Sequence, residues 1–354
     1  MTALAPPDLL SVRAEFTGGR SYLAACTLGL PTRASRAAMI ADLDAAASGR
    51  ACAVAYSAVV ERTRGHFARL VDTDPARIAI GSQTSVLAGL IAAAVPDGAE
   101  VLCADGDFAS MVQPFAHAGR GIRLRTAPVH ELADAITADT WLVAYSIVQS
   151  ATGEVADAEG ISAAAHRHGA RTLCDATQAI GWLPVNAKDH DALICHAYKW
   201  LCAPRGVAFL AISEEFAAAV PPIFAGWYSA ADPWTSCYGS AGALADDATR
   251  FDVSPAWQAF VGAEPVLELF AATDRAALYA HATQLATAFR LGMGLDLPER
   301  PSAIVTWVDA AGADLKRLTD AGITASGRAG RARVAFHVFN DRDDVDAALS
   351  ALGR

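Results

Sequence analysis

Short apolar runs alternate with longer amphipathic segments over the first two thirds of the chain. The runs are bounded by turn residues, and this alternation is typical of βα units around a mostly parallel sheet. The expected strands are Arg77–Ile80, Glu100–Ala104, Gly121–Thr126, Thr140–Ile147, Ala170–Cys174, Ala192–Cys195 and Val207–Ile212. The helices expected between them are Ser85–Ala94, Ser110–Ala118, Glu131–Ile136 and Asp157–Arg167.

The pattern changes after Pro265 to that of a smaller α+β unit. We expect an N-terminal segment over residues 1–20, a large domain over 21–264 and a small C-terminal domain over 265–354. The fold class is therefore α/β, with a mostly parallel seven-stranded sheet flanked by helices in the large domain. The small domain is expected to contain two helical segments, Pro265–Tyr279 and Ala282–Leu291, a strand Ser302–Val308, a helix near Leu315, a strand Ala332–Phe339 and a final helix after Asp341.

The composition supports a folded chain and argues against nucleic acid as a partner. Of the 354 residues, 53% are hydrophobic and 19% charged, which is enough apolar surface for a packed core. The 38 acidic and 28 basic residues give a net charge of -10. Since that charge repels a phosphate backbone and no run of Lys or Arg opposes it, we expect no nucleic acid.

Membrane, secretory and metal-binding signals are missing from the sequence. The amino-terminal residues lack a basic start followed by an apolar stretch, so no secretory signal is expected. The longest uncharged stretches, 82–96 and 216–231, are shorter than the ~20 residues of a membrane span. Seven cysteines without a CxxC pair suit reduced thiols in a cytoplasmic protein, and no zinc-site spacing occurs, so we expect no metal.

The most informative stretches are LCDATQAIGWLPV and DALICHAYKWLCAPRGVAFL. They place Asp175 at the carboxyl end of one expected strand and Lys199 just past another. In an open α/β sheet, ligands bind beyond the carboxyl ends of the strands, so both side chains are expected at one crevice. A lysine between Tyr198 and Trp200 is costly to bury unless its amine is neutral or covalently engaged. The alternative is a loop lysine that extends its amine into solvent.

Three blocks at these positions resemble one enzyme family. They are Asp-Ala-Thr-Gln-Ala at 175–179, Tyr-Lys-Trp-Leu at 198–201 and Ala-Pro-Arg-Gly at 203–206. Together, at this spacing, they resemble the class V aminotransferase group of fold-type I pyridoxal-phosphate enzymes. That group includes cysteine desulfurases, kynureninases, isopenicillin N epimerases and carbon-sulfur lyases. The resemblance runs from about Tyr22 to the end of the chain and implies pyridoxal 5'-phosphate as the cofactor.

The resemblance assigns the central catalytic roles to Asp175 and Lys199. A carboxylate beside the pyridine nitrogen keeps that nitrogen protonated, and Asp175 matches this residue. A lysine binds the cofactor aldehyde covalently and later acts as general acid or base, and Lys199 matches it. Gln178 matches the family residue that hydrogen-bonds the phenolic oxygen of the cofactor.

Further cofactor contacts are implied at the start of a helix and before the lysine. Gln83 and Thr84 resemble the family phosphate loop, although a plain helix cap has the same sequence signature. His196 and Tyr198 stand where family members bind the phosphate. Phe108 matches the position whose ring stacks on the pyridine, and the alternative for Phe108 is an ordinary core aromatic.

Two positions depart from the family pattern. The family asparagine that contacts the phenolic oxygen corresponds to Ser150, so this contact is weaker or comes from Gln149. The segment 249–255 resembles the stretch that crosses a dimer interface and touches the partner's cofactor phosphate. Ser254 and Pro255 replace its usual Gly-Thr, which removes one expected phosphate hydroxyl and leaves Ser254 as the candidate cofactor-binding residue there. The resemblance thus implies a homodimer with shared active sites.

Substrate contacts are expected from an arginine near the C-terminal end of the sequence and from an aromatic loop in the large domain. Arg333 matches the arginine that binds the substrate carboxylate, and Arg331 or Arg328 takes this role if the register differs. Trp227 and Trp234 belong to an aromatic loop that either lines a pocket for a bulky substrate or packs at a dimer interface.

The reaction depends on the substrate pocket and not on the catalytic residues alone. The loop that carries a cysteine in desulfurases corresponds to ITASGRAGRAR, which has none, so a persulfide-forming desulfurase is not expected. The leading hypothesis is a β-lyase that cleaves a cysteine S-conjugate to thiol, pyruvate and ammonia, in a biosynthetic pathway for a sulfur-containing metabolite. The alternatives are an aminotransferase, a decarboxylating oxidative deaminase, a kynureninase-like hydrolase, or a catalytically silent protein of the same fold with a binding or regulatory role.

Overall fold

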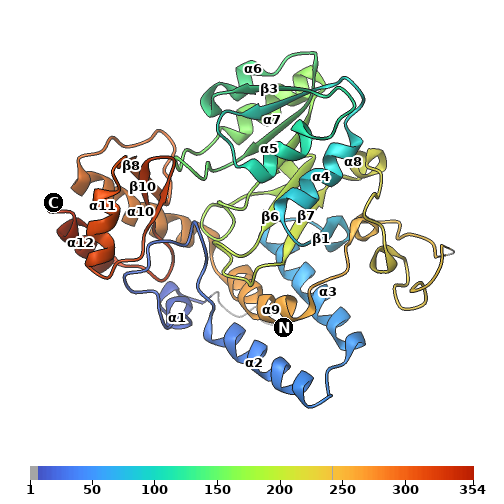
Figure 1. Cartoon of the computed structure of the whole chain (residues 1–354), viewed down its shortest axis with the longest axis horizontal. Coiled ribbons are helices and arrows are strands. Elements are labelled where there is room, and N and C mark those ends of the chain that lie inside the picture. The colour runs from blue at the N-terminus through green and yellow to red at the C-terminus, as the bar shows by residue number, and fades with distance from the viewer. Residues whose placement is uncertain (1–6, 241) are drawn as a thin grey trace.

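The computed structural model describes residues 7–240 and 242–354, so the first six residues of the expected N-terminal segment lie outside it. Its largest feature is a seven-stranded sheet in the order β1-β7-β6-β5-β4-β2-β3 (Figure 1). Strand β7 is antiparallel to both of its neighbours, and the remaining strands share one direction. The expected mostly parallel sheet is confirmed. Its strands are β1 (Ile78–Gly81), β2 (Glu100–Ala104), β3 (Arg123–Ala127), β4 (Thr140–Ser146), β5 (Arg171–Asp175), β6 (Ala192–His196) and β7 (Ala208–Ile212).

Helices cover both faces of this sheet, which explains why its central strands are apolar on both sides. Leu102 and Val143 belong to the core of one face, whereas Val101 and Leu142 belong to the core of the other. The first face is covered by α3 (Ala53–Leu70), α6 (Leu132–Ala135), α7 (Ala158–His168) and α9 (Trp257–Ala272), and the second by α4 (Thr84–Ala94), α5 (Ala109–Ala116) and α8 (Glu214–Ala219).

A second, three-stranded antiparallel sheet lies beside the large one (Figure 1). Its order is β8-β10-β9, and its separate core includes Phe289, Trp307 and Phe336. These elements are α10 (Arg275–Met293), β8 (Ile304–Val308), α11 (Ala313–Asp320), β9 (Ser326–Arg328), β10 (Arg331–Ala335) and α12 (Arg342–Ala351).

The N-terminal part of the chain runs along this small sheet. The backbone N–H of Leu23 donates to the carbonyl of Thr324 at 2.8 Å, and the N–H of Ala335 donates to the carbonyl of Leu23 at 2.9 Å. Leu23 is also part of the small core. The preceding and following helices are α1 (Leu9–Ala14) and α2 (Arg33–Ala47).

The expected bounds of the first two C-terminal helices are wrong. Helix α9 begins at Trp257 and continues through Pro265 to Ala272. The chain breaks at Asp274, whose carboxylate accepts the backbone N–H groups of Ala276 and Ala277 and so begins α10. An aspartate N-cap of this kind stabilises the start of a new helix at this position.

Over residues 7–240 and 242–354, the helices do not combine the length and apolar character that a membrane span requires.

Candidate active site

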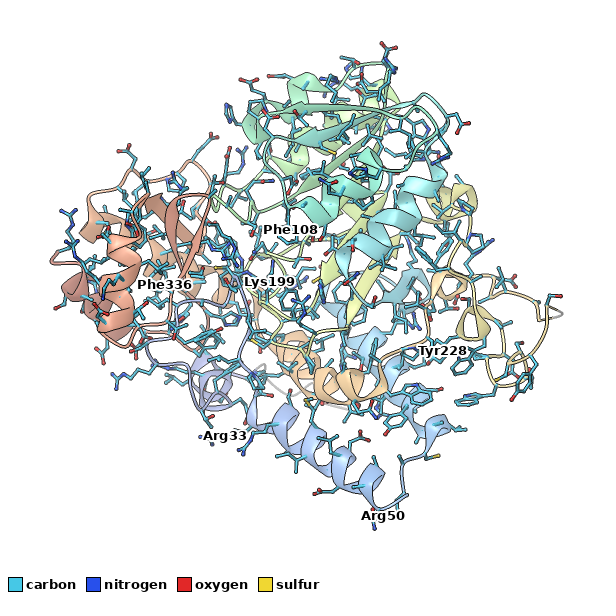
Figure 2. The ribbon with its side chains drawn as sticks, in the orientation of Figure 1. Arg33, Arg50, Phe108, Lys199, Tyr228 and Phe336 are labelled. Carbon is cyan, nitrogen blue, oxygen red and sulfur yellow. The ribbon has the colours of Figure 1, made fainter. Side chains whose placement is uncertain are left out.

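The carboxyl ends of the parallel strands meet at one edge of the large sheet, and the residues that follow them surround a cavity of about 140 Å³. This edge faces the small sheet, and Figure 2 shows Phe108 and Lys199 between the two units. Most of the residues expected to contact the cofactor are brought together here. The lining residues are Gln83, Thr84, Phe108, Ser110, Ser146, Ser150, Asp175, Thr177, Gln178, His196, Tyr198, Lys199 and Arg205.

Lys199 lies in a turn just after β6. The backbone of Gly29 packs closely against the backbone of this turn. The N–H of Gly29 donates to the carbonyl of Tyr198 at 2.8 Å, and the N–H of Cys202 donates to the carbonyl of Lys199 at 3.1 Å. A Cβ at position 29 would lie 2.1 Å from the Lys199 carbonyl oxygen, so only glycine permits this approach. The backbone of the lysine is thereby held in one position.

The amine of Lys199 lies among aromatic rings and away from water. Its Nζ is 5.2 Å from the ring centre of Phe108 and 5.5 Å from that of Tyr198, and the residue is 5% exposed. Burial lowers the pKa of the ammonium group to about 8, while the nearby charge of Asp175 opposes that shift. About a tenth of the amine is therefore uncharged at pH 7 and about half at pH 8, which is far more than for an exposed lysine and suits a nucleophilic or basic role.

Asp175 ends β5 as a buried carboxylate at the floor of the cavity. One oxygen accepts the backbone N–H of Thr177 at 2.8 Å, and the Thr177 hydroxyl accepts the N–H of His196 at 3.0 Å. Burial raises the pKa of Asp175, against the opposing effects of Thr177 and Lys199. A cationic group in the cavity would compensate for this desolvation, so the site fits a ligand with a protonated ring nitrogen.

Gln178 and Ser150 form a hydrogen-bonded wall that reaches Arg333. The amide nitrogen of Gln178 donates to the Cys26 carbonyl at 2.9 Å and to the Ser150 hydroxyl at 3.1 Å. Arg333 donates to both the carbonyl and the hydroxyl of Ser150 and to the Thr27 hydroxyl. Arg333 is 1% exposed and lies behind the lining residues rather than among them.

The three arginines proposed for the substrate carboxylate have different surroundings. Arg333 bonds Ser150 at the cavity wall, whereas Arg331 bonds Thr306 of β8 and Arg328 bonds its neighbour Gly327. The register that the sequence favours thus brings Arg333 to the site.

The phosphate-binding residues expected at the start of a helix and before the lysine all line the cavity. Gln83 and Thr84 form the N-terminus of α4, whose free backbone N–H groups and dipole favour an anion. The Nε2 atom of His196 is buried without a hydrogen-bond partner, and its ring centre is 4.3 Å from that of Tyr198. An unpaired ring nitrogen beside a helix N-terminus fits a phosphate group.

Phe108 is held over the cavity by the residue before it. Asp107 accepts the N–H of Phe108 at 2.6 Å, and its carboxylate also accepts the backbone N–H and the hydroxyl of Ser146 at 2.7 and 2.6 Å. Phe108 is 44% exposed, so the alternative of an ordinary core aromatic is wrong. A free ring face beside Lys199 fits stacking on a planar ligand.

Besides Arg333, which contacts the cavity wall from behind, three predicted residues do not line the cavity within one chain. Trp227 and Trp234 pack on each other with ring centres 5.1 Å apart, and the indole N–H of Trp234 donates to the Ser57 hydroxyl at 3.2 Å. Tyr228, next to Trp227, lies far from Lys199 (Figure 2). Ser254 is exposed and lies before α9. A role for these residues in binding stays a prediction that needs a second chain.

The sequence reasoning missed four lining residues. Thr177 lies inside a block that was recognised. Ser146 ends β4, and Ser110 lies in the first turn of α5 after β2, so their positions alone could have indicated them. Arg205 lies in the recognised Ala-Pro-Arg-Gly block but carries no signal that distinguishes it from a surface arginine.

Comparisons with known proteins agree with this arrangement. Residues 45–295 match the family model described as aminotransferase class-V. The chain is 29% identical over 244 residues to kynureninase from Deinococcus radiodurans, covering 66% of this chain and 59% of that protein. It is 30% identical over 187 residues to isopenicillin N epimerase from Amycolatopsis lactamdurans, covering 46% of each. The chain therefore spans between about half and three fifths of these relatives.

Among solved structures, the chain resembles the cystine C-S lyase C-DES in complex with its reaction product cysteine persulfide. The TM-score is 0.83 at 21% identity, and the likeness covers 95% of this chain and 97% of that one, which shows a shared fold. The family model spans most of the chain and includes the blocks around Asp175 and Lys199. The chain therefore belongs to the aminotransferase class-V family, and the membership predicted from its motifs is confirmed.

Proposed function

We propose that the chain binds pyridoxal 5'-phosphate through Lys199 and acts as a carbon-sulfur β-lyase on a cysteine S-conjugate. The observation that carries the proposal is the buried Lys199 amine, which lies in one cavity with the Asp175 carboxylate and under the free face of Phe108. Asp175 suits contact with a protonated ring nitrogen, and the Phe108 ring suits stacking on a planar ring. The α4 N-terminus and His196 suit binding of a phosphate.

Bound pyridoxal phosphate supplies an electron-withdrawing ring that stabilises negative charge at the Cα of an amino acid. Asp175 holds a proton at the ring nitrogen, because a buried carboxylate gains from a cationic partner. The neutral Lys199 amine removes the proton from Cα, for which a pKa of about 8 is well suited. Arg333 binds the α-carboxylate when its guanidinium exchanges part of its bonding to Ser150.

The overall reaction is elimination followed by hydrolysis. The Cα–H bond and the Cβ–S bond break, the sulfur leaves with the bonding electrons and becomes a thiol, and one water converts the remaining carbon skeleton to pyruvate and ammonia. No oxidant or reductant is consumed.

Two observations favour this reaction within the family. The likeness to the cystine C-S lyase C-DES supports cleavage of a carbon-sulfur bond. None of the seven cysteines lines the cavity, and the segment that leads to β10 contains none; the thiol near Lys199 and Arg333 is that of Cys26, which is buried behind the lining residues.

The test is to incubate the cofactor-loaded protein with S-methylcysteine and to identify products by mass spectrometry. We expect equal amounts of pyruvate and methanethiol, and neither from the Lys199→Ala variant. Formation of a keto acid that retains the sulfur would instead indicate an aminotransferase, and an aldehyde with carbon dioxide would indicate oxidative deamination.

A kynureninase-like hydrolase is the second candidate, and the likeness to kynureninase from Deinococcus radiodurans favours it. The tyrosine directly before Lys199 also suits this reading. Kynurenine in the same assay distinguishes the two activities, because the hydrolase releases alanine whereas the β-lyase does not act on it.

The active form is proposed to be a homodimer in the cytoplasm. Ser254 is exposed outside its own chain's cavity, and Trp234 is 37% exposed, so both are free to meet a second chain. Light scattering at micromolar concentration tests this, and a monomeric mass for the active protein would contradict it.

A further inference from the structure

We propose that Arg205 supplies the positive charge that holds the phosphate group of the cofactor, an inference that rests on the proposed function. Among the residues that line the cavity, Lys199 and Arg205 are the cationic side chains, and all the others except Asp175 and His196 cannot carry a charge near neutral pH. Lys199 is engaged with the reactive end of the cofactor. An anionic group at the other end of the cavity therefore depends on Arg205 for charge balance.

The guanidinium of Arg205 lies over the ring of Tyr198. Its guanidinium carbon lies 4.6 Å from the Tyr198 ring centre, a cation–π distance, and Tyr198 in turn packs against His196 at 4.3 Å. Arg205 thus joins the group of side chains around the unpaired Nε2 atom of His196. The ion pairs formed by the described residues do not include Arg205, so its charge is not already neutralised.

The backbone next to Arg205 also restricts it. Gly206 has a φ of +98°, and a Cβ there would lie 3.6 Å from the Cβ of Ala256 at the start of α9. The turn is therefore packed between the lysine turn and α9. Because Arg205 is itself exposed, its guanidinium can move onto a ligand without disturbing the core.

His196 cannot take over this role. Burial, together with the charges of Arg205 and Lys199, lowers the pKa of His196 to about 3, so its ring is neutral at physiological pH. It can donate or accept one hydrogen bond at Nε2 but adds no charge. The N-terminus of α4 contributes only partial charge, and the hydroxyl of Thr84 is neutral. The group that can supply a full positive charge to the phosphate is therefore the planar guanidinium of Arg205, which can bind phosphate through two parallel hydrogen bonds.

The test compares two forms of the cofactor that differ only in the phosphate. Protein freed of cofactor is titrated with pyridoxal 5'-phosphate and with pyridoxal, and binding is followed by the quenching of tryptophan fluorescence. For Arg205→Ala we expect the dissociation constant of pyridoxal phosphate to rise about 10- to 100-fold, as for the loss of a hydrogen bond to a charged group. The dissociation constant of pyridoxal should change less than about twofold, and Arg205→Lys should recover part of the loss because it keeps the charge.

Arg167→Ala is the matched control, because Arg167 is an exposed arginine in the last turn of α7, which leads to the opposite end of β5. It should leave both dissociation constants unchanged. Equal weakening of pyridoxal and pyridoxal phosphate by Arg205→Ala would show a packing role and overturn the proposal. Unchanged affinity for pyridoxal phosphate with a raised KM for the amino acid would assign Arg205 to the substrate and also overturn it. Failure of the unaltered protein to bind pyridoxal phosphate would refute the proposed function itself.

Discussion

The buried amine of Lys199 should make the cofactor-free protein less stable than a variant with an apolar side chain at this position. The perturbation is Lys199→Met, which keeps a long unbranched side chain and removes the charge. Burial lowers the pKa of this amine from 10.5 to about 8. Since each pKa unit corresponds to about 1.4 kcal/mol, the folded protein loses about 3 kcal/mol by holding the protonated amine.

The sign and the pH window follow from the two pKa values. Below pH 8 the lysine is protonated in both the folded and the unfolded states, and the whole destabilisation is present. Between pH 8 and 10.5 the folded protein has released the proton while the unfolded chain still holds it, so stability rises with pH. The advantage of Lys199→Met should therefore fall from about 3 kcal/mol at pH 7 to about 1.5 kcal/mol near pH 9.5.

Urea unfolding of both cofactor-free proteins at the two pH values measures this difference. Lys188→Met is the control, because Lys188 is exposed and its loss should give no pH-dependent difference. Other groups that titrate in this range are present in both proteins and cancel. A difference between Lys199→Met and the unaltered protein that does not change with pH, or a variant that is less stable at pH 7, would refute the reasoning.

Three further substitutions test features that hold the site in place. Gly29→Ala should displace the lysine turn, since the new Cβ would lie 2.1 Å from the Lys199 carbonyl oxygen. We expect the free energy of unfolding to fall by about 1–3 kcal/mol and cofactor binding to weaken, and an unchanged melting temperature would contradict this. Asp252→Ala removes both hydrogen bonds to the buried Arg64 and leaves its charge without this partner, which should cost about 3–5 kcal/mol in chemical unfolding. A loss below about 1 kcal/mol would show that Glu61 alone satisfies Arg64. Asp274→Ala removes the cap of α10 and should cost about 1 kcal/mol, whereas Asp274→Asn should retain most of the stability because asparagine caps equally well.

The large sheet could be predicted because its strands are buried on both faces and stand out as apolar runs between turn residues. Helices α2 and α3 were not predicted. In α2 only Ser35 is buried, so no apolar stripe marks the helix. In α3 the buried face includes Thr63, Arg64 and His66, which hide its periodicity. Their burial depends on partners from distant parts of the chain.

In the candidate site, too, some residues could be predicted from local sequence and others depend on tertiary packing. Asp175 and Lys199 could be placed because each follows a strand within a distinctive block. The proposed phosphate-binding role of Arg205 could not be predicted from the sequence. It depends on the contact of Arg205 with the Tyr198 ring and on the neutrality of His196, and both arise from tertiary packing. The exclusion of Trp227 and its loop from the cavity likewise follows from packing against α3, which no local pattern reports.

The contact between Leu23 and the small sheet has a consequence for the order of events during synthesis. Leu23 is made long before both of its hydrogen-bond partners, Thr324 and Ala335. The large sheet, whose strands are all complete by Ile212, can begin to pair while the small sheet does not yet exist. The segment that carries Gly29 to the lysine turn is therefore tethered at its other end only after Thr324 and Ala335 have been made. Full organisation of the turn around Lys199 thus follows the pairing of the large sheet, and a nascent chain should acquire affinity for the cofactor only once residues 324–335 have left the ribosome.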